Sequence, residues 1–226
     1  MTRLLEFFSR LRRKGLLGSL RVLGERLGCY CWTVVLLERD LVPPKEHRRR
    51  QDLRVVEITP DLLPAVSEEF NHYGDNLTAL MNGGYIGYAI LTPQDQVAGM
   101  TWVTDKDYYD DQLYRCLVPV PPACAYQFAG EIAPAYRRTG AVVVLLDGVW
   151  RAQRQRGMTR TRALVNRRNL PALKLHVGLD FQELGQEVQV FCLFGCLHYH
   201  RWRRYQVPSL AHVRRAGRLS AERSET

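Results

Sequence analysis

The sequence lacks the features of an exported or membrane-spanning protein. Its six cysteines show no spacing that suggests the disulfide framework of a small secreted domain, so we expect a reducing, cytoplasmic environment. It has no apolar run of about 20 residues, the length that a membrane-spanning helix needs. Charged residues interrupt the apolar N-terminal stretch too often for a secretory signal.

Acidic residues are scarcer than basic ones, with 23 against 32, and the imbalance lies at the two ends. Residues 1–50 carry twelve Lys or Arg against five Asp or Glu, and residues 201–226 carry seven against two. The 150 residues between them are net negative. Basic ends could support an RNA partner, but the interleaved aromatic residues of a stacking platform are mostly missing, so we do not expect nucleic-acid binding.

The first 27 residues combine apolar and basic side chains at helical spacing, which predicts one or two amphipathic helices. Such a segment either packs its leucines on the rest of the protein or lies on an anionic membrane surface, which would make the protein membrane-peripheral. Residues 29–37 are β-branched and aromatic and predict a strand at the edge of the main sheet. Prolines and arginines at 42–52 predict a linker.

Length and composition predict one substantial core with extensions rather than two full domains. The predicted division is a basic extension and linker at 1–52, a single domain at 53–206 and a basic flexible tail at 207–226.

The central stretch, residues 128–181, alternates strand and helix patterns. A short apolar run ends at Pro134, which cannot donate to a sheet ladder. After a basic turn, apolar residues recur every three or four positions, which predicts a helix closed by Gly157. Asn169 then caps a second helix. The predicted order is strand 128–133, turn 136–140, helix 141–153, strand 159–165 and helix 169–178.

The turn at 136–140 suits an anion. A helix entered from a basic, glycine-containing turn presents unpaired N–H groups and the positive end of its dipole, and phosphate fits that description. Gly140 permits close backbone approach, while Arg137 and Arg138 add charge. The alternative is an ordinary connection whose arginines face water.

Three separated blocks keep a recognisable order and spacing: Ile132-x-Pro134-x-x-Arg137-x-x-Gly140, then Val165-x-x-x-Asn169-x-x-Ala172, then Phe181. Together they resemble the acyl-CoA-binding signature of the GCN5-related N-acetyltransferases, over about residues 54–200. The resemblance implies a mixed α/β fold, with a mainly antiparallel sheet splayed beside strand 128–133 and flanked by helices. It also implies acetyl-CoA as cosubstrate and no metal.

By this resemblance, the backbone around Ile132 would bond the pantetheine arm of acetyl-CoA. Backbone N–H groups from 138 to 142 would hold the pyrophosphate, and Asn169 would approach the pantetheine or the departing sulfur. Two positions depart from the family pattern, because Val142 replaces a glycine or alanine and Asp180 replaces a glycine. The expected cofactor-binding residues are Ile132, Arg137, Arg138, Thr139, Gly140, Ala141, Val142 and Asn169.

Two residues are candidates for proton transfer. Glu131 lies on the strand that would carry the thioester and could deprotonate the amine, directly or through water, but it could also face solvent or pair with an arginine. His176 holds the place where the family commonly has a tyrosine that protonates the leaving thiolate. A histidine in the last turn of a helix is also favoured by the helix dipole alone.

The remaining patterns concern the amine acceptor and the sheet. Four aspartates at 105–111 either attract a cationic amine or form a solvated loop. Residues 188–199 read as one long strand or the last strand of a hairpin. Cys192, Cys196, His198 and His200 span roughly 25 Å along a strand, too far for one zinc tetrahedron without a tight turn at Gly195, so no metal site is expected. The other predicted elements are strand 53–58, a helix from Thr59 to Phe70, acceptor contacts there and at 76–82, and a hairpin of 85–91 with 97–104.

These observations predict transfer of an acetyl or other short acyl group from acetyl-CoA to a primary amine by direct attack, without a covalent enzyme intermediate. A strand ending Leu37-Glu38-Arg39-Asp40-Leu41 before such a domain resembles acetyltransferases of cell-surface polysaccharide synthesis, which implies an amino sugar among the acceptors. One alternative is a degenerate fold that binds a nucleotide or partner without catalysis. Another is a membrane-peripheral enzyme using longer acyl chains, and a homodimer is also open.

Overall fold

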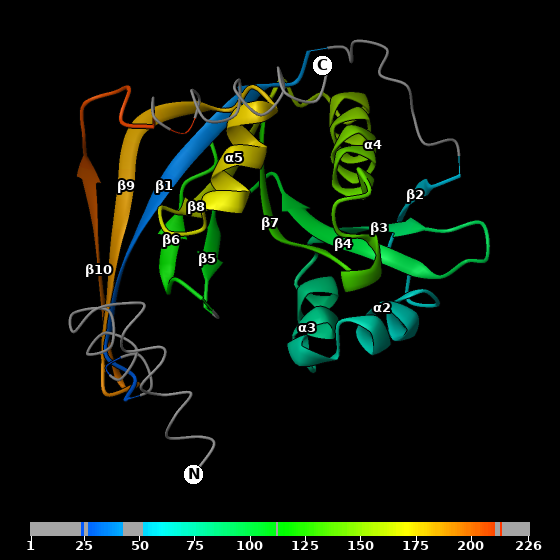
Figure 1. Cartoon of the computed structure of the whole chain (residues 1–226), viewed down its shortest axis with the longest axis horizontal. Coiled ribbons are helices and arrows are strands. Elements are labelled where there is room, and N and C mark those ends of the chain that lie inside the picture. Colours follow the sequence, from blue (N-terminus) through cyan, green and yellow to red (C-terminus); the bar gives the residue numbers. More distant parts are fainter. Residues whose placement is uncertain (1–23, 25–26, 43–51, 112, 211–212, 214–226) are drawn as a thin grey trace.

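The computed structural model describes residues 24, 27–42, 52–111, 113–210 and 213, which form one eight-stranded sheet with helices on both faces (Figure 1). The strand order is β10-β9-β1-β8-β7-β4-β3-β2, and only β7 and β8 pair in parallel. The expected mixed, mainly antiparallel fold is confirmed. The main-sheet strands are β1 Tyr30–Asp40, β2 Arg54–Glu57, β3 Ile86–Leu91, β4 Val97–Thr104, β7 Cys124–Ile132, β8 Arg160–Asn166, β9 Gln182–Leu193 and β10 Leu197–Arg204.

Helices pack on both faces of the sheet. Successive side chains of a strand point to opposite faces, so one strand can contribute apolar side chains to both. On β3, Tyr88 and Ile90 pack in the same core cluster as α4, whereas Ala89 and Leu91 pack with α2 and α3 on the other face. The short sheet of β5 and β6 covers a third cluster near β1, β7 and β9. These elements are α2 Leu63–Glu69, η1 Asn71–Tyr73, α3 Asn76–Asn82, β5 Tyr108–Asp110, β6 Cys116–Val118, η2 Pro134–Tyr136, α4 Ala141–Gln155 and α5 Leu170–Gly178.

The predicted order of the central stretch is confirmed as β7, α4, β8 and α5. Gly157 follows α4 with a φ of 84°, the left-handed conformation in which a helix end favours glycine. The side chain of Asn169 caps α5 by accepting from the N–H of Ala172 at 3.2 Å. The β3–β4 hairpin is also found as predicted.

A strand forms at residues 30–40, but its predicted position at the edge of the sheet is wrong. β1 lies inside the sheet and pairs with both β8 and β9 (Figure 1). Val34 to Leu37 are fully buried, because one face of β1 meets the α4 and α5 cluster and the other meets the β5–β6 cluster. The predicted domain boundary near residue 52 therefore has a strand of the main sheet on its N-terminal side.

Three further predictions need correction. The helix expected from Thr59 begins at Leu63, because Thr59 to Leu62 form a turn and Pro64 occupies the first helical turn. The four aspartates do not form a wholly solvated loop, since β5 includes the buried Asp110. Residues 188–199 are not a single strand, either alone or as the last strand of a hairpin, because β9 ends at Leu193 and β10 begins at Leu197, with the turn at Gly195 between them.

Some predictions fall on residues that lie outside those described. They are the amphipathic helices of residues 1–23, the linker at 43–51 and nearly all of the tail after Leu210. Within the described residues, no helix is both long enough and apolar enough to cross a membrane.

Candidate active site

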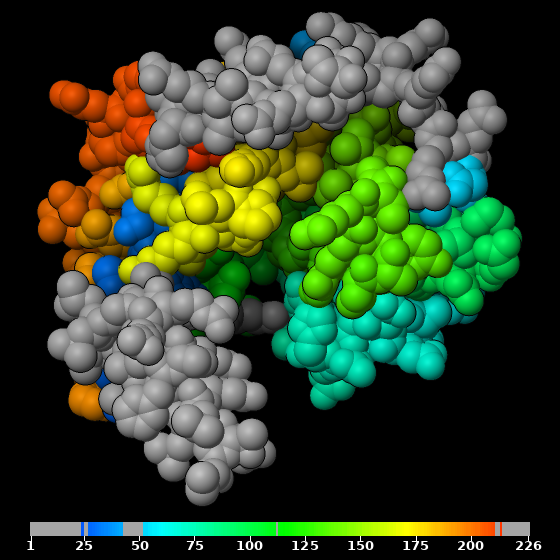
Figure 2. All heavy atoms as spheres, in the orientation of Figure 1, coloured from blue at the N-terminus to red at the C-terminus, as the bar shows by residue number. Residues whose placement is uncertain are grey.

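A cavity of about 510 Å³ lies where β7 and β8 part. Their parallel pairing ends at Gln127 and Ala163, although β7 continues to Ile132 alongside β4. The sheet is therefore splayed, as the sequence predicted. Figure 2 shows the hollow between α5 and α4 on the surface. The cavity is lined by β7, the turn before α4, both helices, β8, Tyr73 and the loop between β5 and β6.

A bulge in β7 lies at the splay. Trp102 of β4 pairs with Phe128, but Met100 pairs with Glu131, so Thr101 faces the two residues Ala129 and Gly130. Ala129 has a φ of 47°, and the Thr101 hydroxyl donates to the carbonyl of Phe128 at 3.1 Å. A bulge leaves its extra residue unpaired and bends the strand. This one turns the strand at the wall of the cavity.

The turn before α4 presents free backbone N–H groups. Arg138 and Gly140 have φ values of 65° and 82°, and Gly140 is the residue that precedes the helix. Among the described residues, no acceptor bonds the N–H groups of Arg138, Gly140, Ala141 or Val142. All four residues line the cavity. Such a concave row of N–H groups at a helix N-terminus is suited to bind an anion.

The other predicted turn residues have structural partners. The Thr139 hydroxyl donates to the carbonyl of Tyr136 at 2.7 Å, and its N–H points to the same carbonyl. The Arg137 guanidinium donates to the carbonyl of Ile132 at 3.1 Å and lies 3.4 Å from the carboxylate of Glu131. Arg137 therefore braces the end of β7.

Val142, one of the two residues that depart from the family pattern, lies at the cavity wall. Val142 is partly buried and packs against the core cluster beneath α4, while its N–H is among the four that have no acceptor. Ala141 beside it is fully buried. The branched side chain thus leaves the N–H available, and its effect on ligand affinity stays a prediction.

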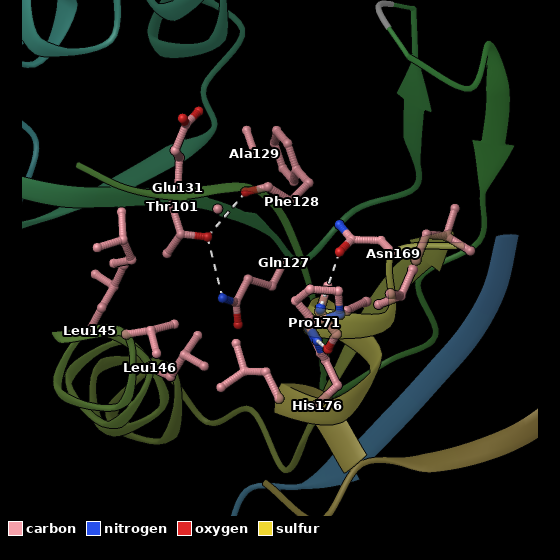
Figure 3. A pocket seen from close by; sticks show the side chains of 18 of the residues that line it. Thr101, Gln127, Phe128, Ala129, Glu131, Leu145, Leu146, Asn169, Pro171 and His176 are labelled. Atoms are coloured by element: carbon pink, nitrogen blue, oxygen red, sulfur yellow. Dashed lines mark hydrogen bonds between the residues drawn. The ribbon is translucent and has the colours of Figure 1, made fainter. Parts of the chain in front are cut away.

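Glu131 lies between His72 and Arg137. Its carboxylate lies 3.0 Å from His72 Nε2 and 3.4 Å from Arg137 Nη2, and a quarter of its side chain is exposed. The predicted alternative that Glu131 pairs with an arginine is therefore found. Glu131 is also among the residues that line the cavity, and its carboxylate points to the side of the strand on which Ala129 lies, away from α4 and His176 (Figure 3). His72 belongs to η1, on the face of the sheet that carries α2 and α3.

His176 lies in the last turn of α5 and lines the cavity (Figure 3). Its Nδ1 lies 2.8 Å from the carbonyl of Ala172, which can only accept, so Nδ1 carries the proton. Burial lowers the pKa of His176, although the bond to Ala172 opposes this. The neutral imidazole therefore presents Nε2 as an acceptor, and proton donation by His176 requires a second proton.

The lowered pKa of His176 gives a stability prediction. Below about pH 6.5, the ordinary pKa of histidine, the unfolded chain takes up a proton more readily than the folded one. The contribution of neutral His176 to the free energy of unfolding is therefore fully present above pH 6.5. It is lost as the pH falls toward the pKa of His176 in the folded state. We expect His176→Gln to flatten the loss of unfolding free energy between pH 7 and 5, by at most about 1.4 kcal/mol per pH unit. Urea unfolding measures this, and parallel pH profiles of the two proteins would contradict it.

Gln127 lies where the pairing of β7 with β8 ends, and its side-chain oxygen accepts no hydrogen bond from the described residues. Because the Thr101 hydroxyl donates to Phe128, it must accept from Gln127 Nε2, which lies 3.3 Å away. The orientation of the amide is thereby fixed. Its Oε1 is buried and has no hydrogen-bond partner among the described residues. The carbonyl end of the amide lies on the side of α4 and His176 (Figure 3).

Sequence reasoning missed His72 and Gln127. His72 precedes Glu131 by 59 residues, so no local pattern connects them. Gln127 lies one residue before the predicted strand 128–133, whereas β7 begins at Cys124. Among the described residues, no group of three or more His, Cys, Asp or Glu side chains could hold a metal ion. Cys192 and His198 do approach each other, at 3.7 Å.

Comparisons with known proteins bear on this arrangement. No protein-family model matches the chain, and no curated protein matches its sequence. A GCN5-related N-acetyltransferase from Sphaerobacter thermophilus has a TM-score of 0.49 at 14% identity, covering 84% of this chain and 57% of that one. The ribosomal-protein-S18-alanine N-acetyltransferase from Escherichia coli has a TM-score of 0.46 at 18% identity, covering 59% and 80%.

One further comparison decides the fold. A GCN5-related glucosamine N-acetyltransferase region, part of a fungal multi-domain GH3 β-N-acetylglucosaminidase, has a TM-score of 0.56 at 12% identity and covers 80% of this chain. This chain has the fold of the GCN5-related N-acetyltransferases. It spans 22% of the fungal chain and 57% of the Sphaerobacter thermophilus chain. At such identities the likeness concerns the acetyltransferase fold alone.

Proposed function

We propose that the protein transfers an acetyl or other short acyl group from acetyl-CoA to a primary amine. The observation that carries this proposal is the row of four unbonded N–H groups at the start of α4, next to the opening between β7 and β8. A pyrophosphate and an extended arm are the two parts of a ligand that such a site would take. The acetyltransferase fold supports the same reading.

The donor would lie along the cavity. Arg138, Gly140, Ala141 and Val142 offer N–H groups to the pyrophosphate, and Arg138 adds its charge. Ile132 is the last residue of the part of β7 that does not pair with β8, and the pantetheine arm would run along this part. Asn169 uses Oδ1 for its cap, so its Nδ2 is the atom left for the arm or the sulfur. Arg137 acts in this proposal as a brace, because its guanidinium is engaged by Glu131 and Ile132.

The reaction needs a neutral amine, since a protonated amine has no lone pair. A lysine-like amine has a pKa of about 10.4, so a base must remove one proton. We assign this to Glu131, with His72 as its hydrogen-bonded partner at 3.0 Å. The nitrogen then attacks the thioester carbonyl, the C–S bond breaks, and the thiolate leaves with a proton. His176 supplies that proton only in its protonated form, which its lowered pKa makes scarce at neutral pH.

Direct attack is favoured over a covalent enzyme intermediate. None of the described residues that line the cavity is a cysteine or a serine. Burial raises the pKa of Cys116 to about 12 and that of Cys124 to about 11, so neither thiol is an activated nucleophile. We therefore expect a ternary complex of protein, acyl-CoA and amine.

The acceptor belongs to the small primary amines. An amino sugar is one candidate, and the likeness to a glucosamine N-acetyltransferase region supports it. A role in cell-surface polysaccharide synthesis remains an expectation from the sequence, as do a cytoplasmic location, membrane contact through residues 1–27 and a homodimer.

A non-catalytic binding module is the second candidate, and the observation that favours it is Val142 at the cavity wall. A thermal melt distinguishes the two. A ligand at a hundred times its dissociation constant adds about 2.7 kcal/mol, which raises the midpoint of a protein of this size by roughly 5 to 10 °C. We expect that rise with acetyl-CoA, and an unmoved midpoint at millimolar ligand would contradict the proposal.

Gln127 gives a test of the arm alone. If its free Oε1 accepts from an amide N–H of the pantetheine arm, Gln127→Leu should weaken acetyl-CoA binding by roughly five-fold, the value of one neutral hydrogen bond. The nucleotide half of CoA without the arm is the control, and its affinity should not change. Calorimetric titration measures both, and equal losses for the two ligands would place the effect elsewhere.

A further inference from the structure

The lining of the cavity carries charges of both signs. Arg138 and the N-terminus of α4 are positive. Glu131, which pairs with Arg137, and the buried Asp110, which accepts from the N–H of Leu113, contribute carboxylates. After burial, Glu131 is the largest cause of the raised pKa of Tyr73 and Asp110 that of Tyr114, so both carboxylates act on phenols of the lining. We call the two carboxylates and these tyrosines the acidic end of the cavity; its charge suits a cation, as the positive groups suit a phosphate donor.

Aromatic side chains line the cavity together with these carboxylates. They are Tyr73, Tyr114, Tyr126 and Phe128. Phe128 stacks on the buried Tyr108 with ring centroids 4.1 Å apart. Ring faces attract ammonium groups, and packed rings hold a fixed shape for an apolar body.

The phenols at this end stay uncharged. Burial, with a smaller effect of Glu131, raises the pKa of Tyr73 to about 12. Burial and then Asp110 also raise the pKa of Tyr126. The tyrosines therefore bring ring faces and neutral hydroxyls, and the negative charge comes from the two carboxylates.

We propose that the acceptor is a primary amine carried on an apolar or aromatic body, bound with its ammonium toward Glu131 and its body between Tyr73, Tyr114 and Phe128. This deepens the proposed function and rests on it, and it favours such an amine over the amino sugar that the likeness of fold suggests. A sugar body would bring several hydroxyls to a wall made largely of ring faces, where each unpaired polar group costs binding energy. The reaction removes the positive charge of the amine, so the neutral amide product has less attraction to this end and leaves.

The chemistry balances with the groups present. The ammonium gives one proton to the Glu131 and His72 pair, and the free nitrogen attacks the thioester carbon. The C–N bond forms and the C–S bond breaks. The amide nitrogen loses its second proton to the thiolate, which leaves as free CoA. No oxidant or further reactant is needed.

A matched pair of amines tests the proposal. Cyclohexylamine and glucosamine both carry a primary amine on a six-membered ring, but only glucosamine carries hydroxyls. We expect kcat/KM with acetyl-CoA to be at least ten-fold higher for cyclohexylamine, and higher still for 2-phenylethylamine. An equal or higher value for glucosamine would overturn the apolar acceptor and leave acyl transfer itself standing. Acetyl-CoA binding without product from any of the three overturns both, and the proposed function fails with it.

A wall variant separates recognition of the body from recognition of the amine. Tyr114→Ala should lower kcat/KM for 2-phenylethylamine about ten-fold and that for methylamine less than three-fold. Tyr114→Phe, which keeps the ring, should keep the wild-type value for 2-phenylethylamine. Acetyl-CoA affinity reports whether the variants are folded. Equal losses for the large and the small amine would contradict a role of the ring in binding the body.

Discussion

Gly140→Asp is expected to weaken acetyl-CoA binding on the order of 100-fold, the loss of one or two charge-assisted hydrogen bonds. Gly140 precedes α4 in the left-handed conformation, and its N–H and those of the next two residues have no acceptor among the described residues. An aspartate there places a carboxylate beside the N–H groups and occupies them itself. The melting shift produced by acetyl-CoA and a calorimetric titration both measure the effect.

Gly157→Asp is a matched control for this substitution. Gly157 follows the other end of α4 with a φ of 84°, and a Cβ at either glycine would meet no atom of the described residues within 4 Å. Both variants therefore carry a similar backbone strain of about 1 kcal/mol, but Gly157 is not part of the cavity lining. The Gly157 variant should melt lower and bind acetyl-CoA normally. Equal binding losses in the two variants would mean that strain, and not a lost phosphate contact, explains the result.

Glu131→Gln is expected to lower kcat about 100-fold while changing the acetyl-CoA affinity less than three-fold. A positioned general base typically contributes at least that factor. Glutamine keeps the shape of the side chain and can still meet His72, but it cannot take the proton of the amine. Steady-state rates with saturating acetyl-CoA measure kcat, and titration measures the affinity.

An ion pair outside the cavity provides the comparison. Glu57 pairs with Arg156 at 2.8 Å, and both side chains are largely exposed. Glu57→Gln also removes one ion-paired carboxylate, yet it should leave kcat at the wild-type value. If Glu131→Gln retains full turnover, the carboxylate serves only to hold Arg137 and the proposed base is wrong.

The local parts of the fold could be predicted because their signals are local. Apolar periodicity, Pro134, Gly140, Gly157 and Asn169 lie within the stretch that they define, and β7, α4, β8 and α5 follow them closely. The β3–β4 hairpin was predictable for the same reason. In each case the residues that set the pattern are the residues that form the element.

Strand order could not be predicted in the same way. The β-branched residues of β1 indicate a strand, but its neighbours β8 and β9 lie more than a hundred residues away. Full burial of Val34 to Leu37 depends on both faces being covered, which only the assembled sheet decides. The β5 and β6 hairpin was hidden for another reason, since its aspartates favour solvent by composition while Tyr108 holds the segment in the core.

In the candidate site too, features that depend on neighbouring residues could be predicted, whereas features that depend on distant residues could not. The turn before α4 was predictable, and so was the position of Glu131 on the strand beside it. The engagement of Arg137 with β7, the contact of His72 with Glu131 and the orientation of Gln127 all depend on residues from other elements. The direction of the His176 proton follows from the helix carbonyl that it meets in the folded chain.

Acyl transfer itself is the most direct test of the central claim. The purified protein is mixed with acetyl-CoA and 2-phenylethylamine, cyclohexylamine or glucosamine, while free thiol and N-acetyl product are followed together. We expect the thiol and an amide to appear in equal amounts, only when both substrates are present, and to fall with Glu131→Gln and Gly140→Asp. Acetyl-CoA that binds but yields neither thiol nor amide with any of these amines would contradict the account and make the binding module the better description.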